Sequence, residues 1–241
     1  MSVRLTPDTN LVILGKVGSG KSEWTKRVLL KSLRRMKSQR IVILDAKNEY
    51  TNIPNNEVAK SPMSLNEMLY QGDNPPQVIR CPIVNPTMEM AENYLRAAWS
   101  PIGHENDPDV IYNPKFPVRV LIEDAPIYYM ERGGRDPPWL KKWFVLGRAG
   151  NRCAAVTMQR TQLCPKVILT MSETICVFVI SSFDAENYVR RYHGDMEANM
   201  VRSLKRYQYM IISDHLDTPL LFDPLVGRFP PRPKGVLLAG K

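Results

Sequence analysis

The residues from Gly15 to Ser22 have the types and spacing needed to bind phosphate groups. They read Gly15, Lys16, Val17, Gly18, Ser19, Gly20, Lys21 and Ser22, and Glu23 follows them. In the pattern Gly-x-x-x-x-Gly-Lys-Ser/Thr, glycines let backbone N–H groups curl around phosphate oxygens, the lysine reaches the β- and γ-phosphates, and the hydroxyl ligates Mg²⁺. We therefore predict that residues 15–23 bind ATP and Mg²⁺, and we favour this interpretation over a simple glycine-rich turn.

The segments on either side of this loop are those that the motif requires. The apolar run Leu11–Leu14 predicts a buried strand, and a helical pattern begins near Glu23. The apolar positions of that helix are Trp24, Val28, Leu29, Leu33 and Met36. A helix that starts directly after the loop adds the positive end of its dipole to the same anion site.

A second candidate for chemistry closes a later apolar run. Residues 118–122 predict a buried strand, and Glu123 and Asp124 follow it directly. In nucleotide hydrolases with a phosphate loop, one carboxylate at such a strand end holds Mg²⁺, and a second often polarises the attacking water. We therefore assign Glu123 and Asp124, together with Ser22, to the metal site. The sequence leaves open which of the two acids is the catalytic base.

Two further motifs resemble those of a known family. After the predicted strand Arg40–Asp45, the residues Leu-Asp-Ala-Lys-Asn-Glu-Tyr resemble the Asp-Pro-Lys-Gly-Glu-Tyr signature of the FtsK/HerA class of P-loop DNA-translocating ATPases. Ala46 stands in place of the proline and Asn48 in place of the glycine. The turn over residues 147–152 and the strand ending Thr-Met-Gln-Arg resemble the family's Gly-Arg-x-x-Gly turn and Thr-Gln-Arg ending.

The resemblance implies roles for residues outside the phosphate loop. Gln159, at the tip of its strand, would sense the γ-phosphate, and Arg148 would act as an arginine finger on the nucleotide of a neighbouring subunit. Arg132, Arg135 and Arg152 are the alternative fingers, and a structural salt bridge is the alternative role for each arginine. The predicted catalytic residues are Lys21, Glu123, Asp124, Gln159 and Arg148. The family normally has Asp before Glu in the acid pair, and this chain has the reverse order.

The order of the predicted elements favours an α/β P-loop NTPase fold of the RecA/ASCE-like type, with a mostly parallel central sheet flanked by helices. Residues 207–212 and 219–222 predict a C-terminal β-hairpin. We expect one ATPase domain over residues 1–226 and a basic, proline-rich tail over residues 227–241. The tail would contact a neighbouring subunit or DNA, or form a disordered terminus.

The resemblance further implies that the protein hydrolyses ATP to move double-stranded DNA as a ring of identical subunits, expected to be a hexamer. A motor core of this size is most similar to the genome-packaging ATPases of double-stranded DNA viruses with internal membranes. Such an enzyme would be virion-associated or in the host cytoplasm, and would dock on a capsid vertex or a membrane-associated protein. The alternatives are a plasmid or conjugative DNA pump and a nucleotide-dependent switch that never moves DNA.

The composition fits an anionic partner but does not specify one. The 241 residues include 33 Lys and Arg against 24 Asp and Glu, which gives a formal net charge of +9. The 4 cysteines have no metal-ligand spacing and are expected to be reduced core residues. We expect a soluble protein without a signal peptide or transmembrane segment, because the sequence shows no signal-peptide pattern at its start and no apolar run long enough to span a membrane.

Two charged segments have both an ordinary and a functional interpretation. The charges between Lys31 and Arg40 form either the solvated face of the first helix or a contact with nucleic acid or another subunit. The loop over residues 126–138 contains Tyr128, Tyr129, Arg132 and Arg135, which suit either a DNA phosphate backbone or an exposed surface loop.

Overall fold

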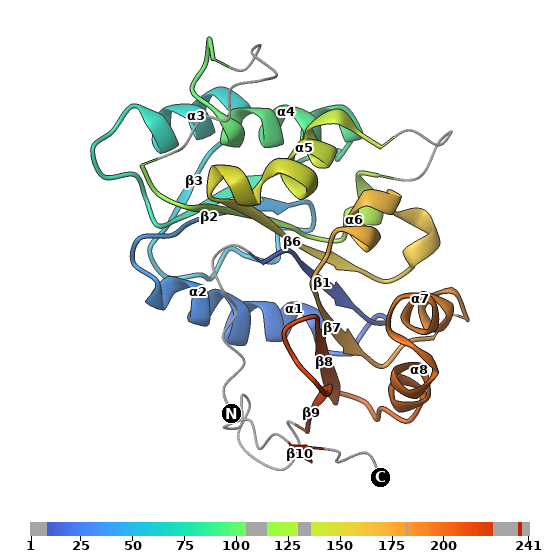
Figure 1. Cartoon of the computed structure of the whole chain (residues 1–241). Coiled ribbons are helices and arrows are strands. Elements are labelled where there is room, and N and C mark those ends of the chain that lie inside the picture. The colour runs from blue at the N-terminus through green and yellow to red at the C-terminus, as the bar shows by residue number, and fades with distance from the viewer. Residues whose placement is uncertain (1–8, 105–114, 130–135, 182, 224–235, 238–241) are drawn as a thin grey trace.

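A computed structural model of the chain describes residues 9–104, 115–129, 136–181, 183–223 and 236–237. In this part of the chain the strands form one ten-stranded sheet in the order β10-β9-β8-β7-β1-β6-β5-β2-β4-β3 (Figure 1). The strands are β1 Leu11–Leu14, β2 Arg40–Asp45, β3 Asn56–Val58, β4 Val78–Pro82, β5 Val118–Ile122, β6 Arg152–Met158, β7 Thr174–Phe178, β8 Tyr209–Ser213, β9 Leu220–Phe222 and β10 Val236–Leu237.

The strands from β7 to β3 in this order run parallel, and β8, β9 and β10 extend the sheet in antiparallel fashion. The central strand β1 pairs with β6 on one side and β7 on the other. Its four residues are completely buried, as expected for a parallel strand that is covered on both faces. The carboxyl ends of the parallel strands therefore share one edge of the sheet, where ligands of such sheets bind.

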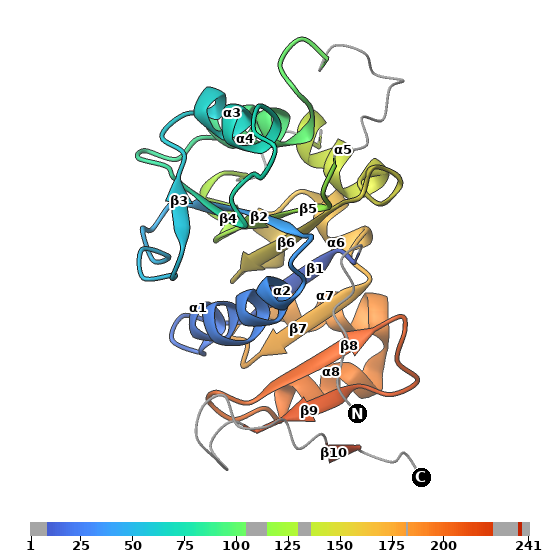
Figure 2. The ribbon, with the colours of Figure 1, turned by 90° about the vertical axis from the view of Figure 1, so that its left-hand side faces the viewer.

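One face of the sheet is covered by the helical stretch Lys21–Arg35. It consists of α1 Lys21–Trp24, a π-helical segment Thr25–Leu30 and α2 Lys31–Arg35. The other face is covered by α3 Pro62–Tyr70, α4 Met88–Trp99, α5 Pro138–Leu146, α6 Lys166–Thr170, α7 Phe183–His193 and α8 Asp195–Arg202 (Figures 1 and 2). Single turns of 3₁₀-helix span Ala125–Ile127, Arg148–Gly150 and Thr161–Leu163.

Alternate residues of each strand belong to the two cores on either side of the sheet. Leu11 and Ile13 pack under the α1–α2 helix, while Val12 and Leu14 pack under the larger helical layer. Aromatic rings attach the hairpin strands β8 and β9 to the first helix. The Trp24 ring lies 5.7 Å from that of Tyr209, which stacks on Phe222 at 4.8 Å. The C-terminal strands are therefore fixed beside the helix that follows the phosphate loop.

The predicted fold is confirmed, including the strand Arg40–Asp45 and the antiparallel pairing of β8 with β9. The elements β3 and α3 were not predicted, because the many Pro, Asn and Asp residues between positions 51 and 117 are typical of turns. All four cysteines are free and buried, as expected. The domain boundary stays a prediction. In the described part of the chain, no helix has both the length and the apolar composition of a membrane span.

The proposed exposure of the loop after Asp124 is wrong for its two tyrosines. The side chains of Tyr128 and Tyr129 are buried in the core under the larger helical layer. Burying the two aromatic rings in the apolar core is energetically more favourable than exposing them to water. The buried rings are therefore not on a surface that could contact DNA. Arg132 and Arg135 lie outside the described residues, as does the tail apart from Val236 and Leu237.

Candidate nucleotide site

The predicted phosphate loop connects β1 to α1 at the carboxyl edge of the sheet. The backbone N–H of Gly15 donates to the carbonyl of Met158 at 3.2 Å, and that of Lys16 donates to the carbonyl of Val179 at 2.9 Å. Met158 ends β6, and Val179 follows β7. The start of the loop is therefore held by both strands that flank β1.

Two glycines of the loop have no substitute in this conformation. A Cβ added to Gly15 would lie 2.7 Å from the Cβ of Phe178, so any side chain would collide with β7. Gly20, which caps the first helix, has a φ of +103°, a backbone conformation that side chains strongly disfavour. Glycine is thus required by close packing at Gly15 and by the backbone conformation at Gly20.

The Lys21 ammonium lies inside the loop. It donates to the carbonyl of Gly15 at 2.5 Å and to that of Lys16 at 2.9 Å. Burial lowers the pKa of Lys21 to about 8, although the nearby charge of Asp124 acts in the opposite direction. Ser19 is completely buried, and its hydroxyl oxygen has no hydrogen-bond partner within the protein. A half-buried cation and a buried, unsatisfied hydroxyl in one backbone loop fit a bound phosphate chain.

Glu123 lies at the end of β5 in a buried environment. Its backbone N–H donates to the carbonyl of Leu44 at 3.2 Å, which ties it to the neighbouring strand β2. The residue is 2% exposed, and one carboxyl oxygen, Oε2, has no hydrogen-bond partner in the protein. Burial raises the pKa of Glu123 to about 7, and the Lys47 ammonium limits the rise.

Asp124 is held more tightly than its neighbour. Its backbone is left-handed, with a φ of +51°, and its N–H donates to Thr157 Oγ1 at 2.7 Å. Its Oδ2 forms an ion pair with Lys47 and accepts a hydrogen bond of 3.3 Å from Gln159 Nε2. Thr157 lies in β6 and Gln159 directly follows the strand, two residues further on, so both reach Asp124 from the same side, and Met158 between them packs in the core under the larger helical layer.

Lys47 is a functional candidate that sequence reasoning missed. Asp45, at the end of β2, accepts hydrogen bonds from the N–H groups of Glu49 at 2.9 Å and Tyr50 at 3.1 Å, which folds the turn after the strand. That turn brings Lys47 onto Asp124. Burial lowers the pKa of Lys47, but the hydrogen bond and charge of Asp124 outweigh it and the net shift is upward. The signal that could have identified Lys47 is its place in the motif after β2 that resembles the family signature.

The same turn explains one departure from the family signature. Asn48 has a φ of +56°, in the left-handed region where glycine is the usual residue and asparagine the common substitute. Its side-chain oxygen also accepts a hydrogen bond of 2.5 Å from Arg80, whose guanidinium contacts Asp45 at 3.3 Å. Asn48 thus adopts the conformation that glycine would supply and adds a side-chain contact.

The residues at this edge fit a magnesium ion that is shared with a nucleotide. Mg²⁺ commonly takes one or two protein oxygens, with phosphate oxygens and waters completing its coordination. Ser22, in the first turn of α1, and Glu123, with its unpartnered oxygen, offer that kind of donor set. Among the described residues there is no cluster of three or more His, Cys, Asp or Glu side chains that would form a metal site without the nucleotide.

Arg148 is not brought to this site. It lies in the 3₁₀ turn before β6, and Gln159 follows the other end of that strand, so the two are separated by roughly 20 Å. Its side chain is 59% exposed and forms an ion pair with Glu173. The alternative finger Arg152 is fully buried, donates to the carbonyls of Gly150 and Trp99, and lies over the Trp99 ring. Arg152 therefore has a structural role.

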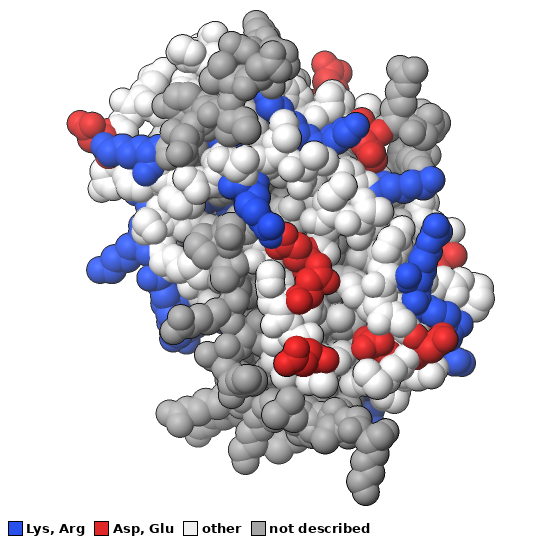
Figure 3. Space-filling view, in the orientation of Figure 1, with Lys and Arg blue, Asp and Glu red and all other residues white. Residues whose placement is uncertain are grey.

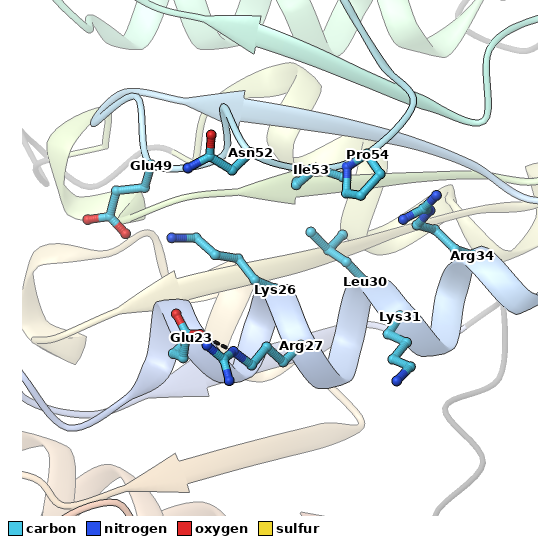
Figure 4. A pocket seen from close by; sticks show the side chains of 10 residues that line it. All are labelled: Glu23, Lys26, Arg27, Leu30, Lys31, Arg34, Glu49, Asn52, Ile53 and Pro54. Carbon is cyan, nitrogen blue, oxygen red and sulfur yellow. Dashed lines mark ion pairs between the residues drawn. The ribbon is translucent and has the colours of Figure 1, made fainter. Parts of the chain in front are cut away.

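A hollow of about 650 Å³ opens between the first helix and the turn after β2 (Figure 4). Its lining residues are Glu23, Lys26, Arg27, Leu30, Lys31, Arg34, Glu49, Asn52, Ile53 and Pro54. Glu23 and Arg27 form an ion pair on its outer side, drawn as a dashed line in Figure 4. Cations outnumber acids here, and the basic residues Lys31 and Arg34 are among those that line the hollow, with Lys31 exposed to solvent.

Charges of both signs are interspersed on the face drawn in Figure 3. Lys and Arg side chains lie along its left-hand and right-hand edges and in its upper part, and the largest group of Asp and Glu side chains lies in the lower centre. This face does not carry a continuous basic stripe, so the net charge of +9 alone does not locate an anionic partner.

Comparison with known families gives one match, over part of the chain. Residues 9–111, which include the phosphate loop, the turn after β2 and helix α4, match the family described as the central domain of helicase HerA. No curated protein sequence matches the chain.

Solved structures with the same fold cover most of the chain. The genome-packaging NTPase B204 from Sulfolobus turreted icosahedral virus 2, in complex with ATPγS, is 18% identical, with a TM-score of 0.71 over 91% of this chain and 99% of that one. VirB4 of Thermoanaerobacter pseudethanolicus is 11% identical, with a TM-score of 0.59 over 88% of each chain. The pCW3 conjugation coupling protein TcpA is 11% identical, with a TM-score of 0.52 over 88% of this chain and 60% of that one. At these identities the likeness shows a shared fold.

Proposed function

We propose that this protein, an FtsK/HerA-type P-loop ATPase, couples ATP hydrolysis to the movement of double-stranded DNA and packages a viral genome into a preformed capsid. The observation that carries the proposal is the cluster at the carboxyl edge of the sheet, where Lys21, Glu123 and Asp124 lie beside the phosphate loop. The B204 genome-packaging NTPase supports the assignment to viral genome packaging, because the structural match covers 91% of this chain and 99% of that one.

In the proposed mechanism, the backbone of residues 15–22 binds the phosphate chain and Lys21 pairs with the β- and γ-phosphates. Ser22 and Glu123 would hold Mg²⁺, which neutralises phosphate charge when bound. Asp124, fixed by Thr157 and Gln159, would orient the attacking water. Because Gln159 contacts Asp124 directly, a γ-phosphate that draws the Gln159 amide away changes the position of the base.

We further propose that the subunits form a ring, expected to be a hexamer, and that Arg148 reaches the nucleotide of a neighbouring subunit. The distance of Arg148 from its own phosphate loop leaves it no role there, and its exposure makes it available to another chain. An arginine supplied in trans stabilises the charge of the transition state. To act in this way, the guanidinium has to exchange Glu173 for phosphate oxygens.

A conjugative DNA pump is the second candidate. The likeness to VirB4 and to the TcpA coupling protein favours it, since both share the fold over 88% of this chain. The packaging assignment predicts docking on a capsid vertex or a membrane-associated capsid protein, whereas the pump predicts docking on a secretion channel. Binding of the purified protein to capsids or to isolated vertex proteins separates these two.

The experiment that tests the proposal is ATP turnover with and without linear duplex DNA over a range of salt concentrations. A motor that grips the phosphate backbone is expected to show strong stimulation that fades as salt rises, because binding releases counterions from the DNA. Equal turnover with and without DNA would contradict the motor and leave a nucleotide-dependent switch. A single-stranded DNA of equal nucleotide content is the matched control for duplex specificity.

A further inference from the structure

The turn that precedes β8 holds an aromatic residue in an unfavourable backbone conformation. Residues 205–208 form this turn, in which the N–H of Gln208 donates to the carbonyl of Lys205 at 3.0 Å. Tyr207 at its third position has a φ of +70°. A bulky residue rarely adopts the left-handed region, where glycine or asparagine is the usual choice, and such strain gathers at functional sites.

The ring of Tyr207 packs against the phosphate loop. The strand β8 runs antiparallel to β7, with Tyr209 opposite Phe178, so the residues just before β8 lie at the edge of the sheet that carries the loop. A Cβ placed on Gly20 would be 3.3 Å from Tyr207 Cδ1. The tyrosine remains 36% exposed, so the ring is in contact with the loop and also accessible to a ligand.

The position of the acids sets the direction in which a nucleotide extends. Glu123, Asp124 and Gln159 come from β5 and β6, on one side of β1, and Tyr207 comes from the β7–β8 side. A γ-phosphate has to face the acids and the metal that they hold. The base at the opposite end of the nucleotide then leaves the loop toward the β7–β8 side, where the Tyr207 ring lies.

We propose that Tyr207 is the base-stacking residue of the nucleotide site, and that it binds the adenine ring of ATP on its aromatic face. The inference rests on the proposed nucleotide site and adds to it the residue that recognises the base. Stacking on an aromatic ring is favourable for every base, because each has a π-face. The Arg206 guanidinium, 4.8 Å from the ring centroid, fixes the orientation of the ring by a cation–π contact.

The test uses the full chain and two ligands, Mg·ATP and Mg·tripolyphosphate, with affinities measured by calorimetry. In Tyr207→Gly, the new residue suits a φ of +70°, so the melting temperature should not fall. We expect its affinity for ATP to drop about tenfold, the size of a lost stacking contact, and its affinity for tripolyphosphate to be unchanged. Tyr207→Phe keeps the ring and should bind ATP normally.

A matched control is Tyr192→Ala, which removes an exposed tyrosine of α7 away from the loop and should change neither affinity. Equal losses of ATP and tripolyphosphate affinity in Tyr207→Gly would overturn the inference, because the ring would then only support the loop. Unchanged ATP affinity in this variant would also overturn it. A wild-type protein that binds neither ligand would overturn the nucleotide site itself, and the inference with it.

Discussion

Asn10 at the amino edge of the sheet and Ser19 and Glu123 at the carboxyl edge differ in how their buried polar atoms are satisfied. At the amino edge, the amide of Asn10 donates to the carbonyls of Phe144 and Met171, each at 3.2 Å, and accepts from the N–H of Ala154 at 2.9 Å. At the carboxyl edge, the buried Ser19 hydroxyl and one oxygen of Glu123 have no partner in the protein. The hydrogen bonds of Asn10 are complete within the protein and stabilise the fold, whereas in the proposed function Ser19 and Glu123 are completed by the nucleotide and its metal.

The variant Lys21→Ala has the largest expected effect and tests this comparison most strongly. Removing the ammonium leaves the phosphate chain without its buried counter-charge, and we expect ATP hydrolysis to be abolished. The measurement is phosphate release under saturating Mg·ATP. Circular dichroism and the melting curve serve as the folding control, because Lys21 carries no core packing. Near-normal turnover would contradict the assignment of the carboxyl edge as the active site.

The variant Arg148→Ala tests whether this exposed arginine at the amino edge acts on the nucleotide of a second subunit. We expect Arg148→Ala to lower turnover by on the order of 10³, as for a lost arginine finger. In its ion pair with Glu173 the arginine side chain is 59% exposed and the glutamate 24%, so solvent screens the pair and stability should fall by about 1 kcal/mol or less. Mixing Arg148→Ala with Lys21→Ala subunits should restore part of the activity, because each supplies what the other lacks. A mixture with no recovery would contradict a finger that acts in trans.

Glu123 predicts a pH dependence of stability. Its pKa in the folded protein, about 7, lies above the ordinary value of 4.5, so the folded state binds more protons in this interval. The free energy of unfolding of the ligand-free protein should therefore fall as pH rises from about 4.5 to about 7. The loss is on the order of 3 kcal/mol at most.

The Glu123→Gln variant lacks the titrating carboxyl and should show a flatter dependence over the same pH interval. Urea unfolding at pH 5 and at pH 8 measures the difference. Equal pH dependence in the wild type and the variant would show that this carboxyl is not the buried acid responsible. The matched variant Asp124→Asn removes an acid that is already paired, and comparing the turnover of both variants identifies the base.

The variant Asn10→Ala is expected to have the smallest effect on activity, and it tests the amino edge of the sheet. Asn10→Ala removes three hydrogen bonds that join α5, α6 and β6 to the start of β1, and should cost about 2 to 3 kcal/mol of stability. The KM for ATP should stay within about twofold of the wild-type value, because the nucleotide site lies at the other edge. Unfolding by urea and steady-state kinetics measure the two quantities. A large rise in KM would show that the edges are not independent.

Much of the fold could be predicted because its determinants are local. The apolar runs Leu11–Leu14 in β1 and Ile41–Leu44 in β2 are continuous, and β5 and β6 are mostly apolar, so each is recognisable as a short buried strand. The elements β3 and α3 escaped prediction, since their signals are weak. Strand β3 has only three residues, none of them buried, and α3 begins at a serine and a proline that also fit a turn.

The candidate site also has parts that could be predicted from the sequence and parts that could not. The place of the phosphate loop between β1 and α1 could be predicted because its residues are adjacent and have the spacing of a known motif. The pair of Lys47 with Asp124 joins residues 77 positions apart, so only the folded chain shows it. Tyr207 escaped for a different reason. Its proposed role rests on a backbone angle and on its contact with Gly20, and neither can be read from the sequence.

The most direct test of the central claim is the stabilisation that Mg·ATP gives to three proteins: the wild type, Lys21→Ala and Asn10→Ala. Ligand at one hundred times its Kd should stabilise a one-site protein by about 2.7 kcal/mol, seen as a rise in melting temperature. If the carboxyl edge is the nucleotide site, the wild type and Asn10→Ala gain the same stabilisation and Lys21→Ala gains almost none. Equal stabilisation of all three proteins, or its loss in Asn10→Ala alone, would contradict the account.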